Sequence, residues 1–361
     1  MQLASRLIAL GALALSGCVA YVDTSALIQP QPGIRLPDNT TVVGGWLAEN
    51  HTIVTEDGVA LYAALFQRPN ARGLVVYFGG NQFTVGRHHA AVLQSYASTD
   101  LDVLIADHRG YGASGGSASL GSLLDDAVIV HDYARDLREY SGLPVLVHGQ
   151  SLGSFMAGEV ARQRSLDGLV LESSATTAED WVKGFVDANP FVRRGVVEDG
   201  LQGQGNLALM SVLDEPLLIV VGEHDRTTRP AMSQRLFEVA RLPPTMKELL
   251  VVPGAGHNDA SAHPSFAAAI VRLLARGDRG VKPSSRISPV AGGGRRCRLW
   301  RLDLEQPKRR RNERIDFMDS LVLSPAQRLC AIPDFPGHGS RFLDHTDAGG
   351  DDGCGRGAKG G

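Results

Sequence analysis

The chain of 361 residues has a formal net charge of −3 at pH 7, with 43% hydrophobic and 21% charged residues. This composition is typical of a core-forming α/β protein and excludes collagen-like, wholly disordered and multi-span membrane chains. Residues 1–276 hold 20 basic and 28 acidic side chains, against 16 and 11 in residues 277–361. Because an acidic body repels phosphate, we expect no nucleic-acid partner.

Residues 1–17 are typical of an export signal, because Arg6 precedes an apolar run that is too short for a stable membrane span. The run ends in LSGC at positions 15–18, which resembles the lipobox of bacterial lipoproteins. That resemblance implies cleavage before Cys18 and an N-terminal lipid that anchors the exported protein in the membrane of the cell envelope. Val19 after the cysteine favours the outer membrane. An ordinary signal peptide and a buried N-terminal helix are the alternatives.

The proline-containing residues 18–45 predict a lipidated tether, and residues 46–276 predict a body that folds without it. An Asp57-Gly58 turn signal between two alternating segments predicts an antiparallel hairpin at the start of the body. Apolar runs predict six further strands, at Gly73–Phe78, Asp102–Ala106, Pro144–His148, Gly168–Leu171, Leu217–Val221 and Glu248–Val252. Periodicity predicts helices near 87–98, 120–140, 152–164, 230–240 and 264–275. This alternation predicts an α/β fold with a mostly parallel, doubly wound sheet and helices on both faces.

Residues 175–210 interrupt the alternation between two predicted strands. Ligands of doubly wound folds bind beyond the carboxyl ends of the strands, so an insertion there predicts a small lid over the site. A surface excursion that does not touch the substrate is the alternative.

The segment Gly149-Gln150-Ser151-Leu152-Gly153 follows a predicted strand and opens a predicted helix. This is the G-x-S-x-G nucleophile elbow in the strand–turn–helix context that it requires. The turn is so tight that its flanking positions tolerate little side chain, which accounts for both glycines. The pattern predicts Ser151 as a nucleophile, and an inert serine in a glycine-rich turn is the alternative.

A serine hydroxyl is a weak nucleophile that needs a base. His257 follows a glycine-rich turn after the last predicted strand, and Asp225 follows the strand before it. The chain order serine, aspartate, histidine is that of α/β-hydrolases. We expect His257 to be the base and Asp225 the acid that holds it, with Glu223 as the alternative acid.

Acyl transfer also needs two N–H donors for the oxyanion. The helix start after the serine predicts the backbone N–H of Leu152 as one donor. The glycine-containing loop after the strand at 73–78 predicts the N–H of Asn81 as the other, with Gly80 as the competitor.

With these motifs the chain resembles the α/β-hydrolase superfamily, near its small lipase, esterase and serine aminopeptidase-like branch. The letters DHRGYGAS at 107–114 resemble the D-x-R-G-x-G-x-S segment after the fourth strand of that branch, and the similarity covers residues 50–276. The resemblance implies an α/β-hydrolase fold. Two departures bear on substrate preference: Gly79-Gly80 replaces the His-Gly of many relatives, and Gln150 stands where histidine is common.

Other polar residues predict no further chemistry. Asp107 and Arg109 are expected to organise loops. His88 and His89 are expected at the surface, because no further ligands accompany them, and we predict no metal. The sequence has no dinucleotide fingerprint or phosphate loop, so we predict no cofactor.

Residues 277–361 lose the periodicity of the body and contain basic and glycine-rich runs. They predict a disordered tail, and contact of the basic runs with an anionic partner is the alternative.

Together these features predict an exported, lipid-anchored serine hydrolase. It would cleave a carboxylic ester, thioester or amide of a small acyl substrate through an acyl-enzyme intermediate. The alternatives are a non-catalytic binding lipoprotein on a hydrolase scaffold and an aminopeptidase-like peptidase.

Overall fold

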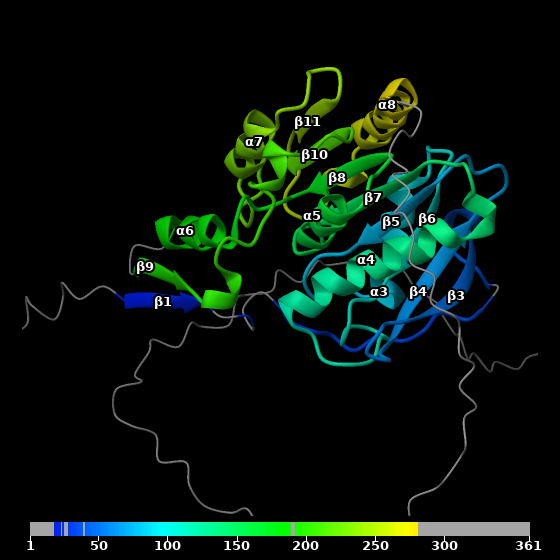
Figure 1. The fold of residues 1–361 in the computed structure, drawn as a ribbon, viewed down its shortest axis with the longest axis horizontal. Helices are drawn as coiled ribbons and strands as arrows, with labels where there is room; N and C mark the ends of the chain where they lie inside the picture. Colours follow the sequence, from blue (N-terminus) through cyan, green and yellow to red (C-terminus); the bar gives the residue numbers. More distant parts are fainter. Residues whose placement is uncertain (1–17, 23, 25–27, 39, 189–191, 281–361) are drawn as a thin grey trace, which may run out of the picture. The chain divides into compact units, whose positions relative to one another are not determined.

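The computed structural model describes residues 18–280 apart from 23, 25–27, 39 and 189–191. Its centre is a nine-stranded sheet in the order β11-β10-β8-β7-β5-β6-β4-β3-β2 (Figure 1). The strands are β2 Thr40–Thr41, β3 Leu47–Val54, β4 Ala60–Gln67, β5 Leu74–Phe78, β6 Asp102–Ala106, β7 Val145–Gln150, β8 Gly168–Glu172, β10 Leu217–Gly222 and β11 Lys247–Val252. The six strands from β11 to β6 are parallel, and β4, β3 and β2 are antiparallel.

The predicted hairpin and the six predicted parallel strands are therefore confirmed. β3 and β4 pair from Leu47↔Gln67 to Val54↔Ala60, around the Asp57-Gly58 turn. Every residue of β5, β6, β7, β8 and β10 is buried, because helices cover both faces of this part of the sheet.

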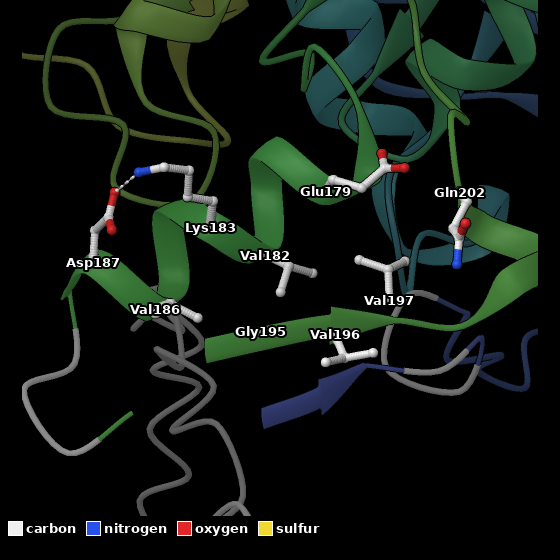
Figure 2. Close-up of a pocket in the computed structure, with 9 residues that line it drawn as sticks. All are labelled: Glu179, Val182, Lys183, Val186, Asp187, Gly195, Val196, Val197 and Gln202. Carbon is white, nitrogen blue, oxygen red and sulfur yellow. Dashed lines mark hydrogen bonds and ion pairs between the residues drawn. The ribbon is translucent and has the colours of Figure 1, made fainter. Parts of the chain in front are cut away.

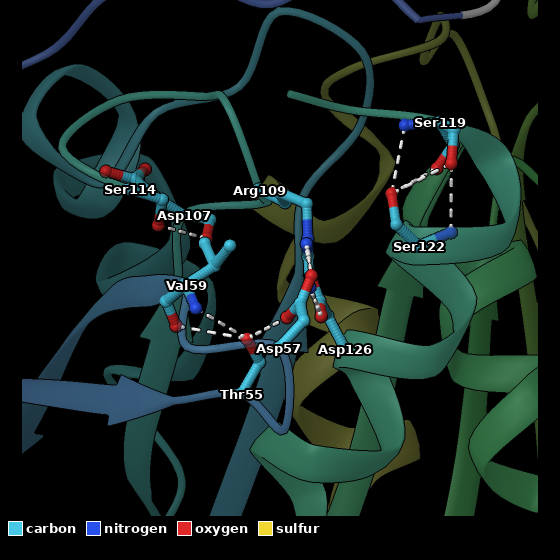
Figure 3. Close-up of polar contacts among 9 residues, drawn as sticks. All are labelled: Thr55, Asp57, Val59, Asp107, Arg109, Ser114, Ser119, Ser122 and Asp126. Atoms are coloured by element: carbon cyan, nitrogen blue, oxygen red, sulfur yellow. Dashed lines mark hydrogen bonds and ion pairs between the residues drawn. The ribbon is translucent and has the colours of Figure 1, made fainter. Parts of the chain in front are cut away.

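The helices are α3 Val85–Tyr96, α4 Leu120–Asp136, α5 Gly153–Gln163, α6 Ala178–Ala188, α7 Pro230–Val239 and α8 Pro264–Gly280. Apolar side chains of α3 and α8 join one core on one face of the sheet, and those of α4, α5 and α7 join a second core on the other. The doubly wound architecture is thus confirmed. α4 begins after Ser119, whose Oγ accepts the N–H of Ser122 at 3.1 Å while the Oγ of Ser122 accepts the N–H of Ser119 at 3.0 Å (Figure 3).

The insertion at 175–210 contains secondary structure that the sequence patterns did not predict. It holds α6 and the strand β9, Val192–Val197, which pairs in parallel with β1, Cys18–Val22. The two form a separate two-stranded sheet. The letters VRRGVV of β9 mix two arginines and a glycine into the apolar run, which hides its strand character.

The tether predicted for residues 18–45 does not describe this segment, because its middle is bound to the body. Ile28 is buried, and the N–H of Gln29 donates to Oδ1 of Asn81 at 2.9 Å. Further hydrogen bonds run from Gly33 N–H to Gly112 O, from Gly112 N–H to Gln31 O and from Leu36 N–H to the Tyr62 hydroxyl. The prolines here belong to an extended, packed strap over residues 28–37. The folded unit therefore begins well before residue 46.

At the carboxyl end, α8 continues four residues past the predicted end of the body at 276. The predicted signal at 1–17 and the predicted tail beyond residue 280 lie outside the described residues.

Asp107 and Arg109 tie loops together (Figure 3). Arg109 donates to both carboxylate oxygens of Asp126 on α4, at 2.8 and 2.7 Å, and to Asp57 in the hairpin turn at 3.0 Å. The hydrogen bond from Arg109 holds the pKa of the Asp57 carboxyl well below its usual range. Asp107 accepts two backbone N–H groups, and its burial raises its pKa to about 6. These contacts confirm the predicted loop-organising role.

The strap at 28–37 gives a stability test. Two variants that both end at residue 280, one beginning at residue 28 and one beginning at residue 38, are compared by thermal unfolding. The shorter chain loses the strap hydrogen bonds and the burial of Ile28, so its melting temperature should fall by about 5 °C or more. Equal melting temperatures would show that the strap is a tether after all.

Candidate active site

The nucleophile elbow joins β7 to α5 with Ser151 at its tip. Ser151 has φ +53°, a left-handed conformation that L-residues adopt at a cost of roughly 1–2 kcal/mol. A Cβ on Gly149 would collide with the carbonyl oxygen of Gly153, and one on Gly153 would collide with that of Phe78. The turn therefore requires both glycines, and Ser151 at its tip is partly buried.

The three residues predicted as serine, base and acid lie in direct contact. Ser151 Oγ is 2.9 Å from Nε2 of His257, and Nδ1 of His257 is 2.9 Å from Oδ2 of Asp225. An ionised carboxylate can only accept a hydrogen bond, so Nδ1 of His257 carries the ring proton and donates a hydrogen bond to Asp225. Nε2 is then the acceptor of the Ser151 hydroxyl. The arrangement leaves a basic nitrogen facing a serine hydroxyl.

Asp225 is buried with its charge surrounded by donors. Its Oδ1 accepts the backbone N–H groups of Thr227 and Thr228, both at 2.9 Å, and its Oδ2 accepts the Thr228 hydroxyl at 2.9 Å. Burial alone would raise the pKa of Asp225, but the hydrogen bonds from His257 and Thr228 outweigh it and leave the pKa below its usual value. The side chain therefore stays ionised beside the histidine.

The alternative acid, Glu223, makes a different contact. Its carboxylate accepts the N–H of Gly254 at 3.0 Å, on the turn that leads to the histidine. Of the two acids after β10, Asp225 is thus the one that reaches His257.

The loop after β5 lies against the serine. A Cβ on Gly80 would be 3.2 Å from the Cβ of Ser151, and the N–H of Phe83 donates to the Gly80 carbonyl at 3.3 Å. Oδ1 of Asn81 accepts the N–H of Gln29 from the strap and the hydroxyl of Tyr111, at 2.9 and 3.1 Å. Within the part of the chain that the structure describes, the backbone N–H groups of Asn81 and Leu152 have no hydrogen-bond acceptor.

Two residues of this site, Ser173 and Thr228, were missed by the sequence patterns, and Gln150 was noted only as a departure that bears on substrate preference. The Thr228 hydroxyl bridges Asp225 Oδ2 and the carbonyl of Ser173, and it lies 3.2 Å from Nδ1 of His257. A threonine three residues after the acid, in the same turn, was the one local signal available.

The predicted surface histidines lie on α3, away from any cluster. His88 stacks on Phe83 and His89 stacks on Phe66, with ring centroids 5.0 and 5.5 Å apart. No group of three or more potential metal ligands occurs among the described residues. None of the helices in the described ranges has the length and apolarity that a membrane span needs.

A groove of about 470 Å³ lies in the insertion, between α6 and β9 (Figure 2). Val182 and Val186 line it from α6, and residues 195–197 line it from β9. An ion pair between Lys183 and Asp187, 2.7 Å long, lies at its rim. None of the three contacting site residues lines this groove.

Thr228 offers a test of how the acid is kept ionised. Thr228→Val removes a hydroxyl donor to Asp225, so the pKa of Asp225 should rise toward its ordinary value. Thr228→Ser keeps the hydroxyl and should leave that pKa in place. Carboxyl ¹³C NMR titration reads both, and the same Asp225 pKa in the two variants would contradict the assigned role of the hydroxyl.

Comparisons with known proteins agree with the fold. A family model described as serine aminopeptidase, S33, matches residues 69–195. Protein bem46 of Schizosaccharomyces pombe is 25% identical over 229 residues, covering 62% of this chain and 75% of that protein. The esterase Pf2001 of Pyrococcus furiosus has a TM-score of 0.55 at 18% identity, covering 69% of this chain and 99% of that one. Est1E from Butyrivibrio proteoclasticus has a TM-score of 0.50 at 18% identity, covering 63% and 99%.

The strand order, the elbow between β7 and α5, and these similarities agree with one another. The fold predicted from the sequence is confirmed: the chain has the α/β-hydrolase fold, and its residues 69–195 are similar to the serine aminopeptidase family.

Proposed function

We propose that this chain is a serine hydrolase that cleaves carboxylic esters of small acyl groups through an acyl-enzyme. The observation that carries the proposal is the unbroken line of contacts from Asp225 through His257 to Ser151, with 2.9 Å at each step. Its chemistry is that of nucleophilic catalysis by a base-activated serine. The description of Pf2001 as an esterase supports the choice of an ester.

In this mechanism Nε2 of His257 takes the Ser151 proton while Oγ attacks the acyl carbon. The carbonyl oxygen becomes an oxyanion, which the N–H groups of Leu152 and Asn81 stabilise, with Gly80 as the competing donor. The tetrahedral intermediate then expels the alcohol, which takes the proton from His257. Water repeats the sequence on the acyl-enzyme, so that the carboxylic acid leaves and Ser151 regains its proton. Asp225 holds the ring and stabilises the imidazolium throughout.

The description of the matching family model favours a second candidate, an aminopeptidase-like activity on an aminoacyl amide. The same serine chemistry would serve it, with an amine as the leaving group. A panel of p-nitrophenyl esters, thioesters and aminoacyl p-nitroanilides of matched acyl chains separates the substrate classes by kcat/KM.

Ser151→Ala tests the serine mechanism. It should lower kcat on the best substrate of the panel by a factor on the order of 10⁴, because the nucleophile is lost while the fold is kept. A fluorophosphonate probe should label wild-type protein at Ser151, located by peptide mass spectrometry.

Ser265→Ala, which removes a partly exposed hydroxyl that contacts Nδ1 of His263 at the start of α8, is the control and should keep full turnover and full labelling. Full turnover by Ser151→Ala would contradict the assignment. Folded wild-type protein that neither turns over nor labels would favour the binding lipoprotein on a hydrolase scaffold.

We propose further that the protein is exported and anchored in the bacterial cell envelope through lipid on Cys18. The support is the LSGC sequence after a short apolar run. Metabolic labelling with radioactive palmitate in a bacterial host should mark the wild-type chain and fractionate it with membranes. Cys18→Ser should abolish the label and release the chain into the soluble fraction, and a labelled Cys18→Ser chain would contradict the anchor.

A further inference from the structure

The catalytic geometry proposed above depends on a backbone carbonyl that two side chains grip. The carbonyl oxygen of His257 accepts the Gln150 side-chain amide at 3.3 Å and the Ser173 hydroxyl at 3.0 Å. Gln150 is the last residue of β7, and Ser173 directly follows β8. Because these strands are neighbours in the sheet, the two donors reach the carbonyl from adjacent strand ends.

Ser173 is held in a conformation that its residue type disfavours. Its φ is +49° and it is fully buried. Its N–H donates to the carbonyl of Val220 at 2.8 Å, and its own carbonyl oxygen lies 2.8 Å from the hydroxyl oxygen of Thr228, whose one proton it shares with Asp225. Strain of this kind persists only where the surroundings enforce it, and here it accompanies a hydroxyl directed at His257.

Gln150 makes contacts on both sides of the serine. Its amide nitrogen donates to His257 O and also to Oδ1 of Asn258, at 3.1 Å. Its Oε1 lies so close to Gly80 that a Cβ there would collide with it. Gln150 is only 8% exposed, so water does not compete freely for these contacts. One amide therefore touches both the loop of the base and the loop of the candidate oxyanion donors.

We infer that Gln150 and Ser173 are positioning residues that fix the backbone of His257 and so set its ring between Ser151 and Asp225. The inference rests on the proposed function. The histidine loop follows a strand and contains glycines at 254 and 256, so its backbone has wide conformational freedom. Two donors on one carbonyl limit rotation of the residue that must keep both 2.9 Å contacts. Gln150 additionally keeps Gly80 in register with the serine.

The test uses Gln150→Met, which keeps the length of the side chain without its donor, and Ser173→Ala. Ser173→Gly is added because glycine tolerates the positive φ and removes the same hydroxyl without backbone strain. Each single variant should lower kcat about three- to tenfold, as expected for one lost hydrogen bond, with KM unchanged. The double variant should lose more than about a hundredfold, more than the product of the singles, because no donor then remains on the carbonyl.

Thr99→Ala is the matched control. It removes a buried hydroxyl that donates to the carbonyl of Tyr96 at the end of α3, away from Ser151 and His257. It should lower the melting temperature and leave kcat unchanged. A loss of kcat in this control equal to that of Ser173→Ala would overturn the inference, because general destabilisation would then explain both.

A spectroscopic readout keeps the inference independent of turnover. The Nδ1 proton with which His257 hydrogen-bonds Asp225 should give a downfield ¹H NMR resonance in wild type and in Thr99→Ala. In the double variant it should broaden or disappear. An unchanged resonance and a kcat within twofold of wild type in the folded double variant would overturn the inference. Wild type without turnover or fluorophosphonate labelling would instead overturn the proposed function, and the resonance would still decide whether the carbonyl grip orients His257.

Discussion

The tight passage of the chain from β7 into α5 constrains everything else in the site. Backbone from Phe78, Gly149 and Gly153 meets there so closely that no side chain fits at position 149 or 153. Ser151 adopts a left-handed φ, and its hydroxyl lies beyond the end of β7. β7 and its neighbours β5 and β8 are wholly buried, and β7 is hydrogen-bonded on both edges. This rigid surrounding maintains the strained conformation of Ser151. The loops after β5, β8, β10 and β11 then need only bring their residues to this fixed point.

The electrostatics of the site depend on the buried carboxylate of Asp225. Asp225 is 3% exposed, and desolvation of a carboxylate is costly unless donors replace the lost water. Two backbone N–H groups, one hydroxyl and the His257 ring supply four such contacts. Because its folded pKa lies below the ordinary value of 3.8, the ionised carboxylate stabilises the fold above that pH. This stabilisation is lost as the pH falls through the folded pKa, so acid weakens the fold and the site together.

The sequence was sufficient for features that repeat locally or occur at strand ends. Apolar runs located the parallel strands, and the order of serine, acid and base along the chain located the three contacting residues. The choice between Glu223 and Asp225 as the acid required the geometry of the turn after β10. In that turn Glu223 accepts the N–H of Gly254, whereas Asp225 contacts His257. Gln150 and Ser173 could not be predicted, because their shared acceptor lies 107 and 84 residues away in the chain. The strap at 28–37 was missed because prolines there indicate extended chain without indicating what it packs against.

The pairing of β1 with β9 has a consequence for the order in which the molecule assembles. Thr24, just after β1, donates through its N–H and its hydroxyl to Glu198, just after β9, across 174 positions of sequence. During synthesis β1 precedes its partner strand β9, and it cannot pair until β3 through β8 and α6 have been synthesised. Closing so long a loop becomes favourable only when the intervening sheet has already brought the ends together. The pairing of β1 with β9 should therefore be among the last contacts of the fold to form.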